Sequence, residues 1–160
     1  MDTESLKIPK DRLITSMWVE TEGQVIASFF LLPQSDRHAG PETPQEVLNQ
    51  PEPFVVVLHE DPQEPRFYNK DAIVRVHYQE PVREDEGVER TVLSARLGLR
   101  DGSIVEGEVR ELLQPEHQRL YDYLNLSGNR FIRVYEVGSE DQVVLVNRDH
   151  IIRILPVNGS

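Results

Sequence analysis

The stretch Asn69-Lys70-Asp71-Ala72-Ile73-Val74-Arg75-Val76 returns as Asn147-Arg148-Asp149-His150-Ile151-Ile152-Arg153-Ile154, 78 positions later. Both copies read Asn, a basic residue, Asp, any residue, Ile, an aliphatic residue, Arg and a second aliphatic residue. A repeat of this kind indicates two copies of one structural unit, and it decides the architecture before any local prediction is made.

The correspondence extends upstream of the repeated stretch. Residues 54–58 match 131–135, and the acid-Gly turn at 22–26 matches the one at 101–105. Acid-Gly pairs between apolar runs are typical of β-hairpins. We therefore predict a first domain at 13–78, an acidic linker at 79–92 and a second domain at 93–156.

Each unit has the same predicted order, which is a hairpin, a short helix and three more strands. Residues 43–46 (Thr-Pro-Gln-Glu) have the form of a capping box, which predicts a helix start in the first unit. Leu120, Tyr123 and Leu124 share one face of a helix in the second unit. The Asn and Asp before each last strand predict a tight turn, because their side chains bond nearby backbone.

Five short strands, with a glycine in the second and a tight turn before the last, resemble SH3-like and Sm-like small barrels. Residues 97–107 are similar to the first hairpin of the Sm-like RNA-binding proteins, and residues 144–151 to their final strands. The layout is also similar to bacterial domains that have no assigned activity. The resemblance implies a mainly β fold of two tandem barrels, each with a short helix between strands two and three, where the Sm family has none.

Composition limits the possible functions. The chain has 160 residues and a net charge of −11, which disfavours binding to a phosphate backbone. It contains no Cys, which excludes disulfides and thiolate metal sites. The sequence shows neither a transmembrane run nor a signal-peptide pattern. We expect a cytoplasmic protein with no cofactor, no metal and no membrane association.

Two resemblances imply a ligand sensor as the alternative function, one that binds RNA as Sm-like proteins do or a nucleotide as PilZ domains do. In Sm-like proteins the turn corresponding to Asn147, Arg148 and His150 helps to bind nucleotides. A second set of residues partly resembles the cyclic di-GMP site of PilZ domains: Arg96, Arg100, Asn125 and Ser127. Paired guanidinium groups can grip phosphate and stack on guanine. The glycine of the PilZ motif would fall at position 130, where Arg stands, and an exposed polar strand face also explains the arginine pair.

The apolar strand at residues 25–32 points to protein association, because Ser28 is its one polar side chain. We predict that both faces of this strand are covered by the other unit or by another subunit. Candidate interaction residues there are Val25, Phe29 and Leu31.

The repeated turn adds further candidates: Asn69, Lys70, Asn147, Arg148 and His150. They could form a rim for a ligand or subunit, or they could simply cap the turn. No catalytic motif is recognisable, so we predict a non-enzymatic interaction or scaffold module that binds a protein partner or itself.

Overall fold

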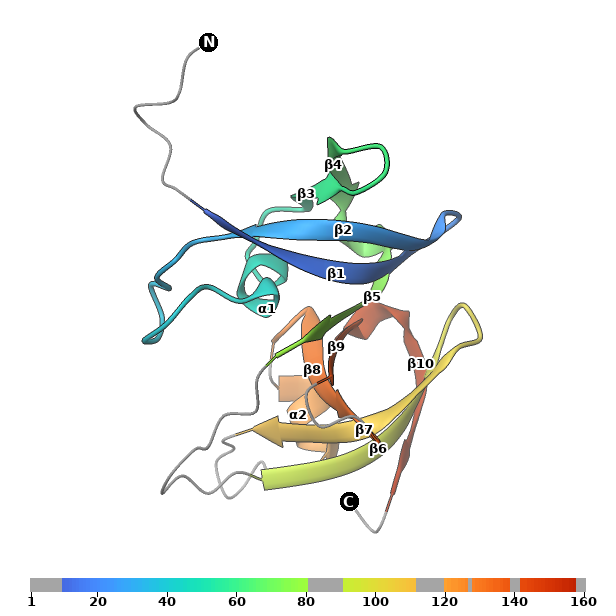
Figure 1. Cartoon of the computed structure of the whole chain (residues 1–160). Coiled ribbons are helices and arrows are strands. Elements are labelled where there is room, and N and C mark those ends of the chain that lie inside the picture. Colours follow the sequence, from blue (N-terminus) through green and yellow to red (C-terminus); the bar gives the residue numbers. More distant parts are fainter. Residues whose placement is uncertain (1–9, 81–90, 112–119, 127, 139–141, 158–160) are drawn as a thin grey trace.

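The computed structural model describes residues 10–80, 91–111, 120–126, 128–138 and 142–157, and it shows one antiparallel sheet with two short helices (Figure 1). The mainly β class predicted from the sequence is confirmed. The first half contains β1 (Asp11–Val19), β2 (Gly23–Leu31), α1 (Pro44–Leu48), β3 (Phe54–His59), β4 (Glu64–Asn69) and β5 (Ile73–Gln79). The second half contains β6 (Thr91–Leu99), β7 (Ile104–Glu111), α2 (Leu120–Leu126), β8 (Phe131–Glu136), β9 (Gln142–Asn147) and β10 (Ile151–Pro156).

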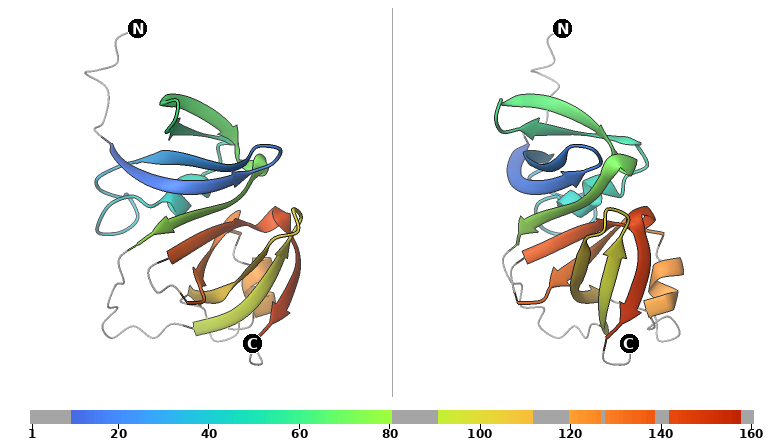
Figure 2. Two further views of the ribbon diagram at one scale, coloured as in Figure 1. Left: turned by 45° about the vertical axis from the view of Figure 1, so that its right-hand side comes forward. Right: turned by 90° about the vertical axis from the view of Figure 1, so that its right-hand side faces the viewer.

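The two halves have the same strand order. The first runs β5-β1-β2-β3-β4 and the second β10-β6-β7-β8-β9, so each strand has a counterpart at the same place in the other half. Antiparallel pairing between β5 and β9 joins the halves into a ten-stranded sheet over the described residues. Figure 2 shows these two strands lying between the halves, with β3 and β4 at the remote end of the first half.

The prediction of two closed barrels is wrong. The strands form one open sheet, because the edge of β9 that could close the second half is paired with β5 of the first half. In the first half β4 pairs with β3 alone among the described strands. Most of the predicted linker, residues 81–90, lies outside the described residues.

The joint between the halves is shared by both hydrophobic cores. Phe131 and Leu145 of the second half pack in the core of the first half, beside Ile73 and Val76 of β5. Val74, on the opposite face of β5, packs in the core of the second half. The two halves therefore bury apolar surface that neither would bury alone, which matters for units of about 65 residues.

Strand β2 is covered on one face within the chain. Val25, Phe29 and Leu31 are all buried in the first core, so these predicted interaction residues are not available to a partner. On the opposite face Ile26 is exposed and Phe30 is half-buried. Coverage of that second face by another subunit stays a prediction.

The sequence alignment that matches Gly23 to Gly102 is one residue out of register with the equivalent positions in the structure of the two hairpins. Met17 lies opposite Val25 in the first hairpin, and Leu97 lies opposite Val105 in the second. Val25 and Val105 are buried, whereas Ile104, which the glycine alignment matches to Val25, is exposed. Because successive side chains point to opposite faces of a strand, the shift exchanges core and surface positions. Burial is thus the reliable guide to equivalent positions.

The predicted capping box of α1 is confirmed. The Thr43 Oγ1 accepts a hydrogen bond from the Glu46 backbone N–H, and the Glu46 carboxylate accepts one from the Thr43 backbone N–H. These bonds satisfy N–H groups that have no partner within a helix. Leu120 and Tyr123 of α2 are buried in the second core and Leu124 packs against it, as the helical spacing predicted.

Candidate functional site

The two ends of the sheet are the first candidates for a functional site. Strands β4 and β10 each have a hydrogen-bonded neighbour on one side only, as far as the described residues go. The outward backbone groups of such a strand can pair with another chain. The surfaces beside these two strands therefore decide what could bind there.

An apolar surface lies beside the β4 edge. It consists of Phe54, Val56 and Phe67, which are 54%, 37% and 73% exposed, and we call it the β4 patch. Val56 and Phe67 lie opposite each other on β3 and β4, and Phe54 shares their face because it is two residues from Val56. Contiguous exposed apolar residues of this kind mark interaction sites. The sequence pattern predicted a strand here and did not indicate that these three side chains would be exposed together.

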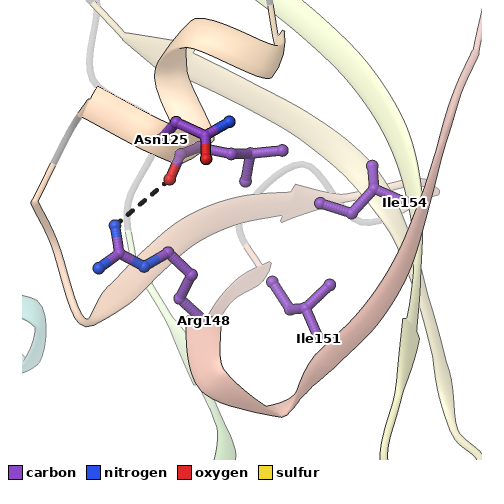
Figure 3. Close-up of a pocket in the computed structure, with 5 residues that line it drawn as sticks. Asn125, Arg148, Ile151 and Ile154 are labelled. Carbon is purple, nitrogen blue, oxygen red and sulfur yellow. Dashed lines mark hydrogen bonds between the residues drawn. The ribbon is translucent and has the colours of Figure 1, made fainter.

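A hollow of about 350 Å³ lies at the opposite end of the molecule, between α2 and β10. Among the described residues its walls are Leu124, Asn125, Arg148, Ile151 and Ile154, and we call it the β10 hollow (Figure 3). The Arg148 Nη1 donates a hydrogen bond to the Leu124 backbone carbonyl at 3.3 Å, which ties the last turn to the helix. Leu124, Ile151 and Ile154 supply aliphatic walls, and Asn125 and Arg148 supply polar ones.

The repeated turns are capped by their asparagines. The Asn69 Oδ1 accepts a hydrogen bond from the Asp71 backbone N–H at 2.9 Å, and the Asn147 Oδ1 accepts one from the Asp149 N–H at 3.0 Å. A local structural requirement therefore accounts for the Asn-x-Asp pattern in both copies.

The second turn also binds to the first. The Asn147 Nδ2 donates hydrogen bonds to the backbone carbonyls of Lys70 and Ile73 at 3.2 and 3.0 Å. The His150 Nε2 lies 2.7 Å from the backbone carbonyl oxygen of Asp71. Asn147 and His150 are buried by these contacts. Of the two alternatives for this turn, a rim for a neighbour or a turn cap, the cap is present, and the turn also contacts the other half of the same chain.

Lys70 is buried rather than available to a ligand. Its ammonium group donates a hydrogen bond to the Gln50 backbone carbonyl at 2.9 Å. Burial lowers the pKa of Lys70, and the nearby Arg130 lowers it further. A buried ammonium with a carbonyl partner has a structural role in closing the loop before β3.

The residues of the PilZ-like pattern have partners within the chain. The Arg96 Nε lies 2.7 Å from Glu106, and the Arg100 Nε donates to the Asp149 backbone carbonyl at 2.7 Å. The Asn125 Nδ2 donates to the Tyr121 backbone carbonyl at 2.8 Å. Ser127 lies outside the described residues. Nucleotide binding by this set stays a prediction.

A cluster of aromatic and polar side chains around Arg75 also joins the two halves. Its guanidinium lies 4.2 Å above the Trp18 ring, and its Nη1 donates to the Ser103 Oγ at 2.7 Å. The Arg75 Nε donates to the His77 Nε2 at 3.0 Å, which requires a neutral imidazole. Burial lowers the pKa of His77 to about 4, and the charge of Arg75 acts in the same direction. The cluster links β5 to the turn between β6 and β7.

Acidification should therefore destabilise the fold through His77. Between pH 6.5 and about pH 4 the unfolded chain binds a proton at this position and the folded chain does not. The stability is present above pH 6.5 and is lost as the pH falls. The shift of the pKa from 6.5 to about 4 sets an upper limit of about 3.4 kcal/mol, and solvent screening of the partly exposed ring reduces the loss to about 2–3 kcal/mol. Urea unfolding of the protein and of His77→Gln at both pH values isolates this contribution from the carboxylates. If the free energy of unfolding falls equally in the two proteins, His77 makes no contribution to the pH dependence.

The Arg133 guanidinium is the other charge held at the joint. It lies 2.7 Å from Glu80 and donates to the Tyr78 hydroxyl at 3.2 Å and to the Gln45 Oε1 at 3.2 Å. Burial alone would lower the pKa of Arg133, but Tyr78 and Glu80 outweigh it and the pKa is raised. A partner on each side of the guanidinium keeps this half-buried charge satisfied.

Three further findings bear on function. In the part of the chain that the structure describes, no cluster of three or more His, Cys, Asp or Glu side chains could hold a metal ion. No helix among those residues has the length and apolar character needed to cross a membrane. Comparisons with protein-family models, with curated proteins and with solved structures found no match, so the inference of function rests on the geometry above.

Proposed function

We propose that this chain is a non-enzymatic protein-interaction module, and that the ends of its sheet are the surfaces that bind protein. The observation that carries this proposal is the β4 patch, which exposes two phenylalanines beside a strand edge that no described strand pairs with. Burying an aliphatic or aromatic side chain contributes about 1.5–3 kcal/mol. Three such side chains next to free backbone groups supply both affinity and alignment for a partner strand.

We also infer that the module arose by duplication of one unit. The identical strand order supports a duplicated unit of the SH3-like or Sm-like type at 13–78 and 93–156, with its seam opened so that two units can share strands. Sharing of β5 and β9 is itself an association of two units through their edges. The edge of β4 could pair with another unit in the same way as β9 pairs with β5.

Site-specific photo-crosslinking tests the proposed function. A photoreactive phenylalanine analogue at position 67 should form an adduct with a protein in cells that produce this chain. The same analogue at position 104 provides the control, because Ile104 is 59% exposed but lies on β7, inside the sheet. Adducts at position 67 that are absent at position 104 support the proposal. Equal yields at the two positions, or none at either, would refute it.

A further inference from the structure

We propose that the partner is a second copy of this chain, and that the β4 patch of one copy enters the β10 hollow of the next. This inference rests on the proposed function, because it names the protein that the sheet ends bind. The β5–β9 joint between the two halves is the precedent for this contact. The residues equivalent to its two sides lie beside β4 and β10, at opposite ends of the molecule (Figures 1 and 2).

The joint is built around Phe131 at the start of β8. Its side chain is fully buried and packs in the same core as Leu48, Ile73 and Val76. The Asn49 side chain holds its backbone at two points. The Asn49 Oδ1 accepts from the Phe131 N–H at 2.7 Å, and the Asn49 Nδ2 donates to the Phe131 carbonyl at 3.1 Å. An asparagine after α1 thus fixes the strand that enters from the other half.

Every wall of the β10 hollow has a counterpart on the receiving side of this joint. The two helices correspond at a spacing of 76 positions and the turns with their last strands at 78. The hollow residues Leu124, Asn125, Arg148, Ile151 and Ile154 thereby match Leu48, Asn49, Lys70, Ile73 and Val76. In the first half this space is occupied by Phe131; in the second half no described residue fills it.

The inserted side of the joint has its counterpart in the β4 patch. Phe54 begins β3 as Phe131 begins β8, and Phe67 precedes Asn69 by two residues as Leu145 precedes Asn147. Phe131 and Leu145 are both fully buried, whereas Phe54 and Phe67 are the exposed members of each pair. By analogy with the joint, a helix and a final strand like α1 and β5 would cover the patch. A pair of strands like β8 and β9 would fill the hollow.

The register of the joint predicts how two copies would pair. Leu145 lies opposite Val76 and Val143 lies opposite Tyr78. The counterparts place Phe67 opposite Ile154 and Pro65 opposite Pro156. Since proline has no N–H to donate, the new ladder would end at this proline pair. Side-chain burial, rather than a long ladder, then carries the association and makes it reversible.

Such contacts join unlike surfaces, so each added copy leaves one patch and one hollow free. Head-to-tail contacts of this type produce rings where the rotation closes and filaments where it does not. They also allow a decisive mixing experiment, because a copy with a blocked patch still offers its hollow. A copy with a blocked hollow still offers its patch.

Light scattering on two blocked variants tests the inference. Phe54→Asp blocks the patch and Asn125→Arg blocks the hollow; both residues are exposed, so the fold should tolerate the changes. The unmodified chain should form species larger than a dimer as its concentration rises. Each variant alone should remain a monomer, and an equimolar mixture should reach twice the chain mass and no more. Ile104→Asp, at an exposed position on a strand inside the sheet, should assemble like the unmodified chain.

Three results would overturn the inference: a chain that stays monomeric at its highest soluble concentration, variants that do not combine, or an Ile104→Asp chain as defective as Phe54→Asp. Circular dichroism melting confirms that each variant is folded. If Asn125→Arg unfolds, Tyr121→Arg replaces it, because the exposed Tyr121 is the counterpart of Gln45, which donates to the Phe131 carbonyl at the joint. The crosslinking at position 67 separates the two proposals. An adduct with a different protein keeps the proposed function and refutes self-assembly, whereas the absence of any adduct refutes both.

Discussion

Replacing Phe131 by alanine should lower the free energy of unfolding by about 3–5 kcal/mol, the usual cost of truncating a buried phenylalanine. Phe131 is fully buried at the joint, so its loss leaves a cavity between the two halves and removes apolar contacts from the first core. Urea denaturation followed by circular dichroism measures the change.

The chain provides a matched control for this substitution. Phe54 occupies the equivalent position at the start of β3, but it is exposed. Phe54→Ala should therefore change the free energy of unfolding by less than about 1 kcal/mol at concentrations where the protein is monomeric. Similar costs for the two substitutions would mean that Phe131 is not enclosed by the first half, and the description of the joint would be wrong.

Replacing Gly107 by alanine should lower the free energy of unfolding by about 3 kcal/mol, through overpacking rather than a cavity. A Cβ at this position would overlap the backbone carbonyl oxygen of Tyr135 and would lie 2.6 Å from the Val134 Cγ1. Backbone cannot move aside as a side chain can, so β7 and β8 would have to separate where they pair. Thermal and urea unfolding give the size of the loss.

Gly98→Ala is the control for Gly107→Ala. Its Cβ would lie 2.9 Å from the Arg153 Nη2, which is the end of a flexible and exposed side chain. That side chain can rotate away, so the expected loss is less than about 1 kcal/mol. A larger loss for Gly98→Ala than for Gly107→Ala would contradict the close approach of β7 and β8.

The local structure was largely predictable from the sequence. The capping box at Thr43, the helical face at Leu120 and Tyr123, and the Asn-capped turns at Asn69 and Asn147 depend on residues a few positions apart. Interactions over such short distances are encoded in the pattern itself. The alignment of the hairpins failed by one residue, because glycine marks a turn but does not fix which side chains face the core.

The candidate site was not predictable in the same way. Phe54 and Phe131 begin equivalent strands within similar apolar runs, yet one is exposed and the other is enclosed. Val25, Phe29 and Leu31 were predicted to face a partner and instead fill the core of their own half. Exposure depends on what packs against a strand from elsewhere in the chain, and a strand pattern does not carry that information.

The amino-acid sequence by itself determined that this protein is a repeat of one β-rich unit with a short helix, because strands, caps and turns follow from neighbouring residues. Only the tertiary structure decided that the units share strands β5 and β9 in an open sheet, and that one copy of each paired surface is left uncovered. The physical reason is that edge pairing is set by which backbone groups remain unpaired after both halves have folded, a property of the assembled sheet rather than of any segment.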